Sequence, residues 1–173
     1  MNKLICLDAN ISGWVFRDNS PEVGIEAEYK RANQLCKLLS QNGYYFIIPS
    51  IVLSELFCKF TESEQVHRFK KIQEKNILFC GFDFQTSMIL SRILHHRYFV
   101  ESKAYQDLDI TKRKMKYDAI ILACAVQQGA SCLYTTDGDL KKYDESFIPI
   151  KGLNDLPPEM EELGGLFDEE QVQ

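Results

Sequence analysis

The stretch Lys116-Tyr117-Asp118-Ala119-Ile120-Ile121-Leu122-Ala123-Cys124-Ala125, followed by Thr135-Thr136-Asp137-Gly138-Asp139, decides the fold. Residues 118–128 are apolar on nearly every side, which predicts a helix that opens at Asp118 and packs within the core. Residues 131–134 form a short apolar run typical of a buried strand, and two more carboxylates follow its end. Carboxylates at the ends of two adjoining elements, beside a core, indicate a site for a hard cation.

Further apolar runs predict the rest of a sheet. Strands are expected at 3–7, 44–48 and 77–80, and a weak fifth at 147–150, where Pro149 favours an edge position. Helical spacing or capping signals predict helices over 26–41, 50–60, 61–75 and 84–98. Residues 11–24 are expected to be a loop with room for a short helical turn, and the polar segment 101–116 is expected to be a loop. Alternating strands and helices predict an α/β fold, a three-layer sandwich whose central, mainly parallel sheet of about four to five strands is flanked by helices.

Composition limits the class of protein. The chain has 173 residues, 45% of them hydrophobic, which suits one domain; we expect this domain over 1–152 and an acidic tail over 153–173. A net charge of −5 argues against a broad basic surface for nucleic acid. Six cysteines without a C-x-x-C pair indicate buried thiols in a reducing compartment. No signal peptide or membrane span is evident, so a cytoplasmic protein is expected.

Four carboxylates are expected to converge. Ligand sites of parallel sheets lie outside the carboxyl ends of the strands. Asp8 follows the first strand, and Glu55 lies one turn into the helix after the second strand. Asp118 opens the helix before the fourth strand, and Asp137 follows the fourth strand. Clustered carboxylates repel one another unless a cation neutralises them. Mg²⁺ or Mn²⁺ prefers such oxygen ligands, and phosphodiester hydrolysis is the natural chemistry of such a site.

Other acid-bearing or nucleotide-binding α/β enzymes fit less well. Phosphatases of the haloacid dehalogenase type need a second acid two residues after the nucleophilic Asp, but Asn10 stands there. The chain lacks both G-x-G-x-x-G and G-x-x-x-x-G-K-[ST]. It also lacks the nucleophile elbow of a serine or cysteine hydrolase.

Four motifs resemble, in order, those of PIN-domain ribonucleases. They are Asp8-Ala9-Asn10, Pro49-Ser50-Ile51-Val52-Leu53-Ser54-Glu55-Leu56, Tyr117-Asp118-Ala119-Ile120-Ile121-Leu122-Ala123-Cys124-Ala125 and Thr135-Thr136-Asp137-Gly138-Asp139-Leu140. Over 1–152 the layout is most similar to VapC-type toxins of toxin–antitoxin pairs. Ala9 departs from the pattern, since Ser or Thr is common there, and Leu140 replaces a frequent aromatic residue. The 17–28 stretch, the 101–116 segment and the acidic tail also make the chain longer than a compact toxin.

The resemblance implies roles for individual residues. Asp8, Glu55, Asp118 and Asp137 would bind Mg²⁺ or Mn²⁺ directly or through water. Asp139 would hold a second ion or support the first ligands, and Asn10 and Thr135 would orient water or those ligands. Basic side chains are candidates for binding the RNA backbone: Arg17, Lys112, Arg113, Lys114 and Lys116.

The implied function is that of a metal-dependent endoribonuclease that leaves 5′-phosphate and 3′-hydroxyl ends. The resemblance also implies a homodimer and, for a toxin, an antitoxin partner whose arm covers the site. Two alternatives stay open. One is a catalytically silent module that binds RNA or protein, and the other is a structure-specific DNA nuclease. Metal titration and parallel assays on RNA and flapped DNA would separate the three.

Overall fold

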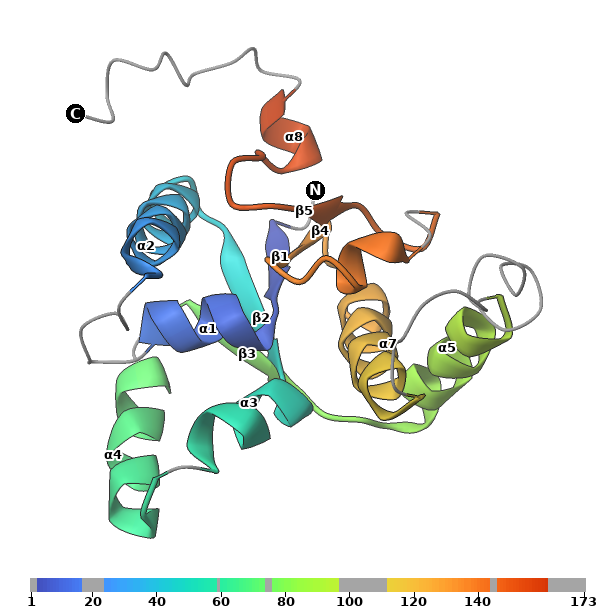
Figure 1. Ribbon diagram of the computed structural model, residues 1–173, viewed down its shortest axis with the longest axis horizontal. Coiled ribbons are helices and arrows are strands. Elements are labelled where there is room, and N and C mark those ends of the chain that lie inside the picture. The colour runs from blue at the N-terminus through green and yellow to red at the C-terminus, as the bar shows by residue number, and fades with distance from the viewer. Residues whose placement is uncertain are drawn as a thin grey trace.

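Five parallel strands form one sheet at the centre of the molecule (Figure 1). The computed structural model describes residues 3–16, 24–58, 60–73, 76–96, 112–143 and 146–161. The strands are β1 (Leu4–Leu7), β2 (Tyr45–Pro49), β3 (Ile77–Cys80), β4 (Cys132–Tyr134) and β5 (Ile150–Lys151), in the spatial order β3-β2-β1-β4-β5. This confirms the predicted α/β class with a parallel sheet, and β5 lies at an edge as Pro149 suggested.

The strand order reverses next to β1. The chain proceeds outward from β1 to β2 and β3 and then returns to β4 on the other side of β1. Leu4 pairs with Tyr45 of β2, and Leu7 pairs with Tyr134 of β4. The carboxyl ends of β1 and β4 therefore lie side by side at the point where open α/β sheets bind their ligands.

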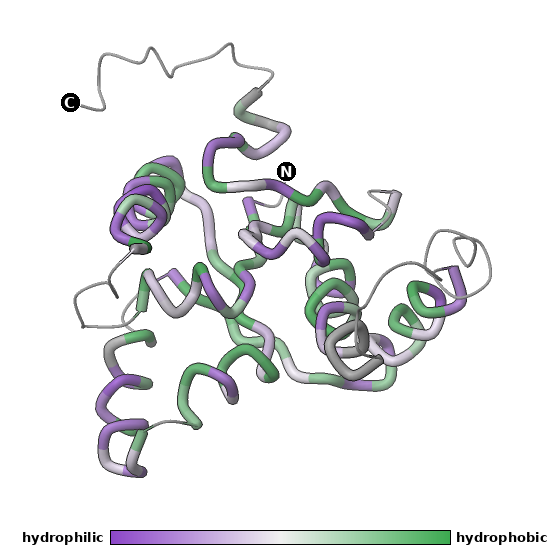
Figure 2. Tube along the Cα trace, in the orientation of Figure 1, coloured by the Kyte–Doolittle hydropathy of each residue, from purple (hydrophilic) through white to green (hydrophobic). Residues whose placement is uncertain are grey.

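Helices cover both faces of the sheet, and each face has its own core. One core includes Ile5 and Leu7 and is covered by α1 (Ala9–Phe16) and α2 (Glu26–Gln41). The other includes Cys6 and is covered by α3 (Ser50–Phe57), α5 (Phe84–His95) and α7 (Lys112–Gln127). Alternate side chains of β1 enter opposite cores because successive residues of a strand point to opposite faces. Figure 2 shows the matching amphipathic pattern on α2, with purple and green turns side by side.

Local signals set several helix ends. In α4 (Glu62–Gln73), the backbone N–H of Thr61 donates to Glu64 Oε2 over 2.8 Å, which confirms the capping box expected there. The Asp83 side chain accepts a hydrogen bond from Thr86 N over 2.8 Å and caps α5. Two short elements complete the described chain: the 3-10 helix η2 (Leu140–Lys142) and α8 (Pro158–Glu161).

Two expectations about the helices were wrong. Residues 9–16 form α1, whereas a loop was expected from residue 11. Helix α7 begins at Lys112, so Asp118 lies in its second turn and does not open it. The extra turns follow from sequence, since the Lys and Arg residues before Asp118 are good helix formers.

The segment after β5 contacts the core. Leu153 and Met160 pack against the cluster beneath α2, and Tyr134 Oη donates to the Asp155 carbonyl over 2.8 Å. The rest of the acidic tail, residues 162–173, lies outside the part of the chain that the structure describes. Among the helices that it does describe, none is long and apolar enough to span a membrane.

Candidate active site

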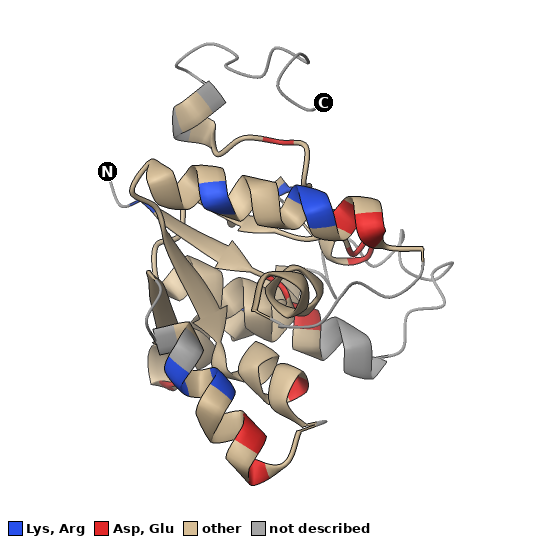
Figure 3. Ribbon diagram, turned by 90° about the vertical axis from the view of Figure 1, so that its left-hand side faces the viewer, with Lys and Arg blue, Asp and Glu red and all other residues tan. Residues whose placement is uncertain are grey.

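A pocket of about 350 Å³ opens at the carboxyl edge of the sheet. The four carboxylates expected to converge all line it: Asp8, Glu55, Asp118 and Asp137. They come from the end of β1, from α3, from α7 and from the loop after β4. Figure 3 shows acidic segments (red) of several elements on the side toward which the strand arrows point. The remaining lining residues are Ala9, Asn10, Tyr117, Ile121, Thr135 and Leu140.

Asp8 is held rigidly where β1 becomes α1. Its backbone N–H donates to the Tyr134 carbonyl of β4 over 3.1 Å, which continues the pairing of the two strands. Its Oδ1 accepts from the N–H of Ile11 over 2.9 Å, and its carbonyl accepts from the N–H of Ser12 over 2.9 Å. Asp8 therefore caps α1, although only 5% of the residue is exposed.

Thr135 links the carboxylate of Asp8, which follows β1, to the backbone of Asp137, which follows β4. It is fully buried, and its backbone N–H donates to the Lys151 carbonyl over 3.0 Å. Its hydroxyl donates to Asp8 Oδ2 and accepts from the N–H of Asp137 over 2.9 Å. One side chain thus sets the orientation of Asp8 and the path of the chain at Asp137.

Burial makes the ionised site costly. It raises the pKa of Asp8, and the nearby charge of Asp137 raises it further. Hydrogen bonds from Thr135, Ile11 and Thr136 lower the pKa of Asp8 and offset part of this effect. Desolvation also raises the pKa of Glu55, although that side chain is largely exposed on α3. Both groups would bind a proton or a cation more readily than the same carboxylates in water.

Asp118 enters the pocket from the other core. It is buried, with 8% of the residue exposed, and lies between the lining residues Tyr117 and Ile121 along α7. Helix α3 contacts both α1 and α7. This packing brings Glu55 and Asp118 to the same pocket from different elements. Tyr117, Ile121 and Leu140 give the pocket an apolar wall that the sequence analysis did not identify.

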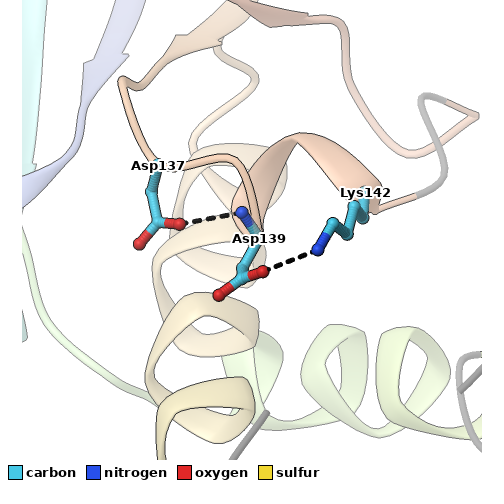
Figure 4. Close-up of polar contacts among 3 residues, drawn as sticks. All are labelled: Asp137, Asp139 and Lys142. Atoms are coloured by element: carbon cyan, nitrogen blue, oxygen red, sulfur yellow. Dashed lines mark hydrogen bonds and ion pairs between the residues drawn. The ribbon is translucent and has the colours of Figure 1, made fainter. Parts of the chain in front are cut away.

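Asp139 lies in a different setting from the other acids (Figure 4). Its backbone N–H donates to Asp137 Oδ1 over 2.8 Å, and its own Oδ1 forms an ion pair with Lys142 Nζ at 2.8 Å. It is not among the residues that line the pocket. The structure therefore places Asp139 beside the four carboxylates but separates it from their pocket.

The donor set suits a hard divalent cation. All four acidic groups offer oxygen, and the lining residues within the described part of the chain include no Lys, Arg or His. Within the described chain, no three acidic, His or Cys side chains are already grouped closely enough to hold one ion. The four carboxylates would therefore share a cation partly through water or after side-chain adjustment, and the pocket has room for that water.

The candidate RNA-binding residues lie where the structure gives no account of them. Arg17 is outside the described residues. Lys112, Arg113, Lys114 and Lys116 belong to the first turns of α7, but their side chains are outside the described part of the structure. Asn10, by contrast, lines the pocket next to Asp8, as its expected role requires.

Comparisons with known proteins agree with this architecture. The model of one protein family, described as "PIN domain", matches residues 5–146. The fold is similar to a chain in the crystal structure of VapBC2 from Rickettsia felis, which is bound to a DNA fragment from the VapBC2 promoter. The TM-score is 0.59 and the sequence identity 18%, and the match covers 86% of this chain and 98% of that chain. The fold is less similar to Mycobacterium tuberculosis VapC20, a sarcin–ricin loop cleaving toxin: TM-score 0.49 and 14% identity over 82% of this chain and 97% of that chain. No curated protein matches the chain.

Proposed function

This chain belongs to the PIN-domain family, and we propose that it is a Mg²⁺- or Mn²⁺-dependent endoribonuclease that hydrolyses phosphodiester bonds of RNA. The observation that carries the proposal is the pocket at the switch point of the sheet. Carboxylates from four separate elements line it, and among the described residues that line it none is basic. A fold gains nothing from collecting such repelling charges unless they bind a cation.

Each residue of the pocket has a proposed part. Asp8, Glu55, Asp118 and Asp137 would hold the metal ion, which when bound lowers the pKa of a water molecule and stabilises the negative charge of the reacting phosphate. Thr135 orients Asp8, and Asn10 lies at hand to orient water at the same edge. Tyr117, Ile121 and Leu140 form an apolar wall against which the substrate would pack. Attack of water at phosphorus leaves 5′-phosphate and 3′-hydroxyl ends.

We also infer the biological setting. The likeness of fold to a VapBC2 chain supports a VapC-type toxin, and hence an antitoxin partner, a homodimer and a cytoplasmic location. A pocket lined by four carboxylates would accept an inserted Arg or Lys from such an antitoxin. Arg17, Lys112, Arg113, Lys114 and Lys116 remain the proposed contacts to the RNA backbone, and residues 1–152 the proposed nuclease domain.

The test compares cleavage by purified variants. Asp118→Asn and Glu55→Gln should each abolish Mn²⁺-dependent cleavage of a mixed single-stranded RNA pool while circular dichroism shows an intact fold. Glu28→Gln on the exposed surface of α2 is the matched control and should cleave normally. Full activity of Asp118→Asn would refute the proposed site. Cleavage of flapped DNA in preference to RNA would favour a DNA nuclease. Absence of both cleavage and a Mn²⁺-induced thermal shift in the wild type would favour a binding module.

A further inference from the structure

Lys142 lies two residues after Leu140, which lines the pocket, and the carboxylate site does not explain its ion pair with Asp139. We propose that Lys142, held in place by Asp139, binds a backbone phosphate of the RNA next to the reacting one. This inference rests on the proposed nuclease function. It makes Lys142 a substrate-binding residue and Asp139 a positioning residue.

A continuous series of contacts leads from the pocket to Lys142. The Thr135 hydroxyl joins Asp8 to the backbone of Asp137, and Asp137 Oδ1 accepts from the backbone N–H of Asp139 over 2.8 Å. Asp139 Oδ1 then accepts from Lys142 Nζ over 2.8 Å (Figure 4). Leu140, which begins η2, is buried and lines the pocket, so the 3-10 helix that carries Lys142 is anchored in the wall of the site.

The charges of the site create a need for such a cation. A phosphodiester strand carries one negative charge per nucleotide, and four carboxylates line the pocket that must receive it, with no basic side chain among the described lining residues. A bound metal ion would offset this repulsion only near the reacting phosphate. The neighbouring phosphates would lie outside the pocket, where an ammonium group fixed beside Asp139 would attract them.

The pair of Asp139 and Lys142 is suited to orient a cation without burying it. The Lys142 side chain is 43% exposed and that of Asp139 is 24% exposed, so solvent and a ligand can reach the ammonium. An ion pair at this exposure is weak, and a phosphate oxygen can share the ammonium with it. The contact holds a flexible side chain in one position before the substrate arrives.

The neighbouring Lys141 provides a natural contrast. Its Nζ lies 2.9 Å from the point that a Cβ on Gly152 would occupy, and Asp155 Oδ2 lies 3.2 Å from that point. Lys141 therefore extends toward the segment after β5, although it has the same charge and the adjacent position in η2. A general effect of net charge would be the same for both lysines, whereas phosphate binding outside the pocket would depend on Lys142 alone.

Binding and its salt dependence test the proposal. The probe is a fluorescein-labelled single-stranded RNA of mixed sequence, titrated with Asp118→Asn protein in Mg²⁺ between about 50 and 200 mM NaCl. We expect Lys142→Gln to weaken binding several-fold and to reduce the slope of log Kd against log salt by about 0.7, the value for one phosphate contact on a single strand. Lys142→Arg should restore both quantities, and Lys141→Gln should change neither. Equal slopes for the Gln variants of the two lysines would overturn the proposal.

Kinetics of the otherwise unchanged enzyme separate positioning from metal binding. Asp139→Asn should raise KM several-fold and leave the Mn²⁺ concentration for half-maximal activity unchanged. A tenfold rise in that concentration would make Asp139 a metal ligand and overturn its positioning role. If the wild type cleaves RNA and Lys142→Gln has the same KM as the wild type, this inference is overturned and the proposed function stands. Absence of any RNA cleavage by the wild type overturns the proposed function, and the salt slopes still decide whether Lys142 binds phosphate.

Discussion

Replacing Thr135 by Val should show how much the fold depends on one buried hydroxyl. Val has nearly the shape of Thr, so the change removes two hydrogen bonds and leaves the packing of a fully buried residue in place. Asp8 Oδ2 loses a donor, and the N–H of Asp137 loses its acceptor. The Asp8 carboxylate oxygen and the N–H of Asp137 then each lack the hydrogen bond that Thr135 provides.

The magnitude follows from the kind of bond lost. A hydrogen bond to a charged group contributes about 1.5–3 kcal/mol to stability, and a neutral one about 1 kcal/mol. The free energy of unfolding should therefore fall by about 2–4 kcal/mol, a large share of the roughly 5–15 kcal/mol typical of a domain. Thr135→Ser keeps the hydroxyl and loses one methyl group, so it should cost only about 1 kcal/mol.

Urea unfolding in EDTA, followed by circular dichroism, measures these differences. The pH dependence adds a second test. The Thr135 hydroxyl lowers the pKa of Asp8, so its contribution is present when Asp8 is ionised and is lost as falling pH protonates Asp8. The loss caused by Val should thus shrink between about pH 7 and about pH 4. A loss no larger than that of Ser, or one that does not change with pH, would refute the reasoning.

Three further outcomes are expected. Asp8→Asn should raise the melting temperature in EDTA near pH 7, because burial raises the pKa of Asp8 and its ionised form therefore destabilises the fold. The gain should vanish as the pH falls below 3.8, the ordinary pKa of an Asp side chain. A lower melting temperature of the variant at neutral pH would contradict this prediction. Leu122→Ala should lower the free energy of unfolding by about 2–5 kcal/mol in urea titrations, because Leu122 is fully buried in the core under α7; a loss below about 1 kcal/mol would contradict that packing. Mn²⁺ should raise the melting temperature of the wild type more than that of Asp137→Asn, EDTA should reverse the shift, and equal shifts would exclude Asp137 as a ligand.

The strands could be read from the chain because parallel strands buried on both faces are nearly continuous apolar runs. The same runs located the edge where Asp8 and Asp137 follow β1 and β4. Convergence of the four carboxylates on one pocket followed from topology alone, since parallel strands place all their carboxyl ends on one side.

Helix α1 could not be read in the same way. Its residues include Ser12 and Gly13, which form helices poorly, so local propensity favoured a loop. Tertiary contacts decide otherwise, because Asp8 caps the first turn and Ile11 is fully buried beneath α2. Asp8, directly before α1, is a capping signal as well as a predicted metal ligand, and only the second property enters the prediction from sequence.

Asp139 and Lys142 show a second limit of the sequence. The spacing Asp137-Gly138-Asp139 suggested two acids with one purpose, and nothing in it indicated that the second would pair with a lysine three residues later. Such pairing depends on the turn that η2 makes after β4. The start of α7 was misplaced for a related reason, since a run of basic residues suits a solvated loop as well as an exposed first turn.

The all-parallel sheet also gives the molecule two distinct sides, one that carries the pocket and one that carries the turns before the strands. Every strand ends on the side of the pocket, so the turns that precede the strands lie on the opposite side. Gln41, exposed at the end of α2 just before β2, is one position there. A fluorophore or a surface tether attached at this residue would leave the pocket facing solution, so that an immobilised protein could be presented with RNA from the open side.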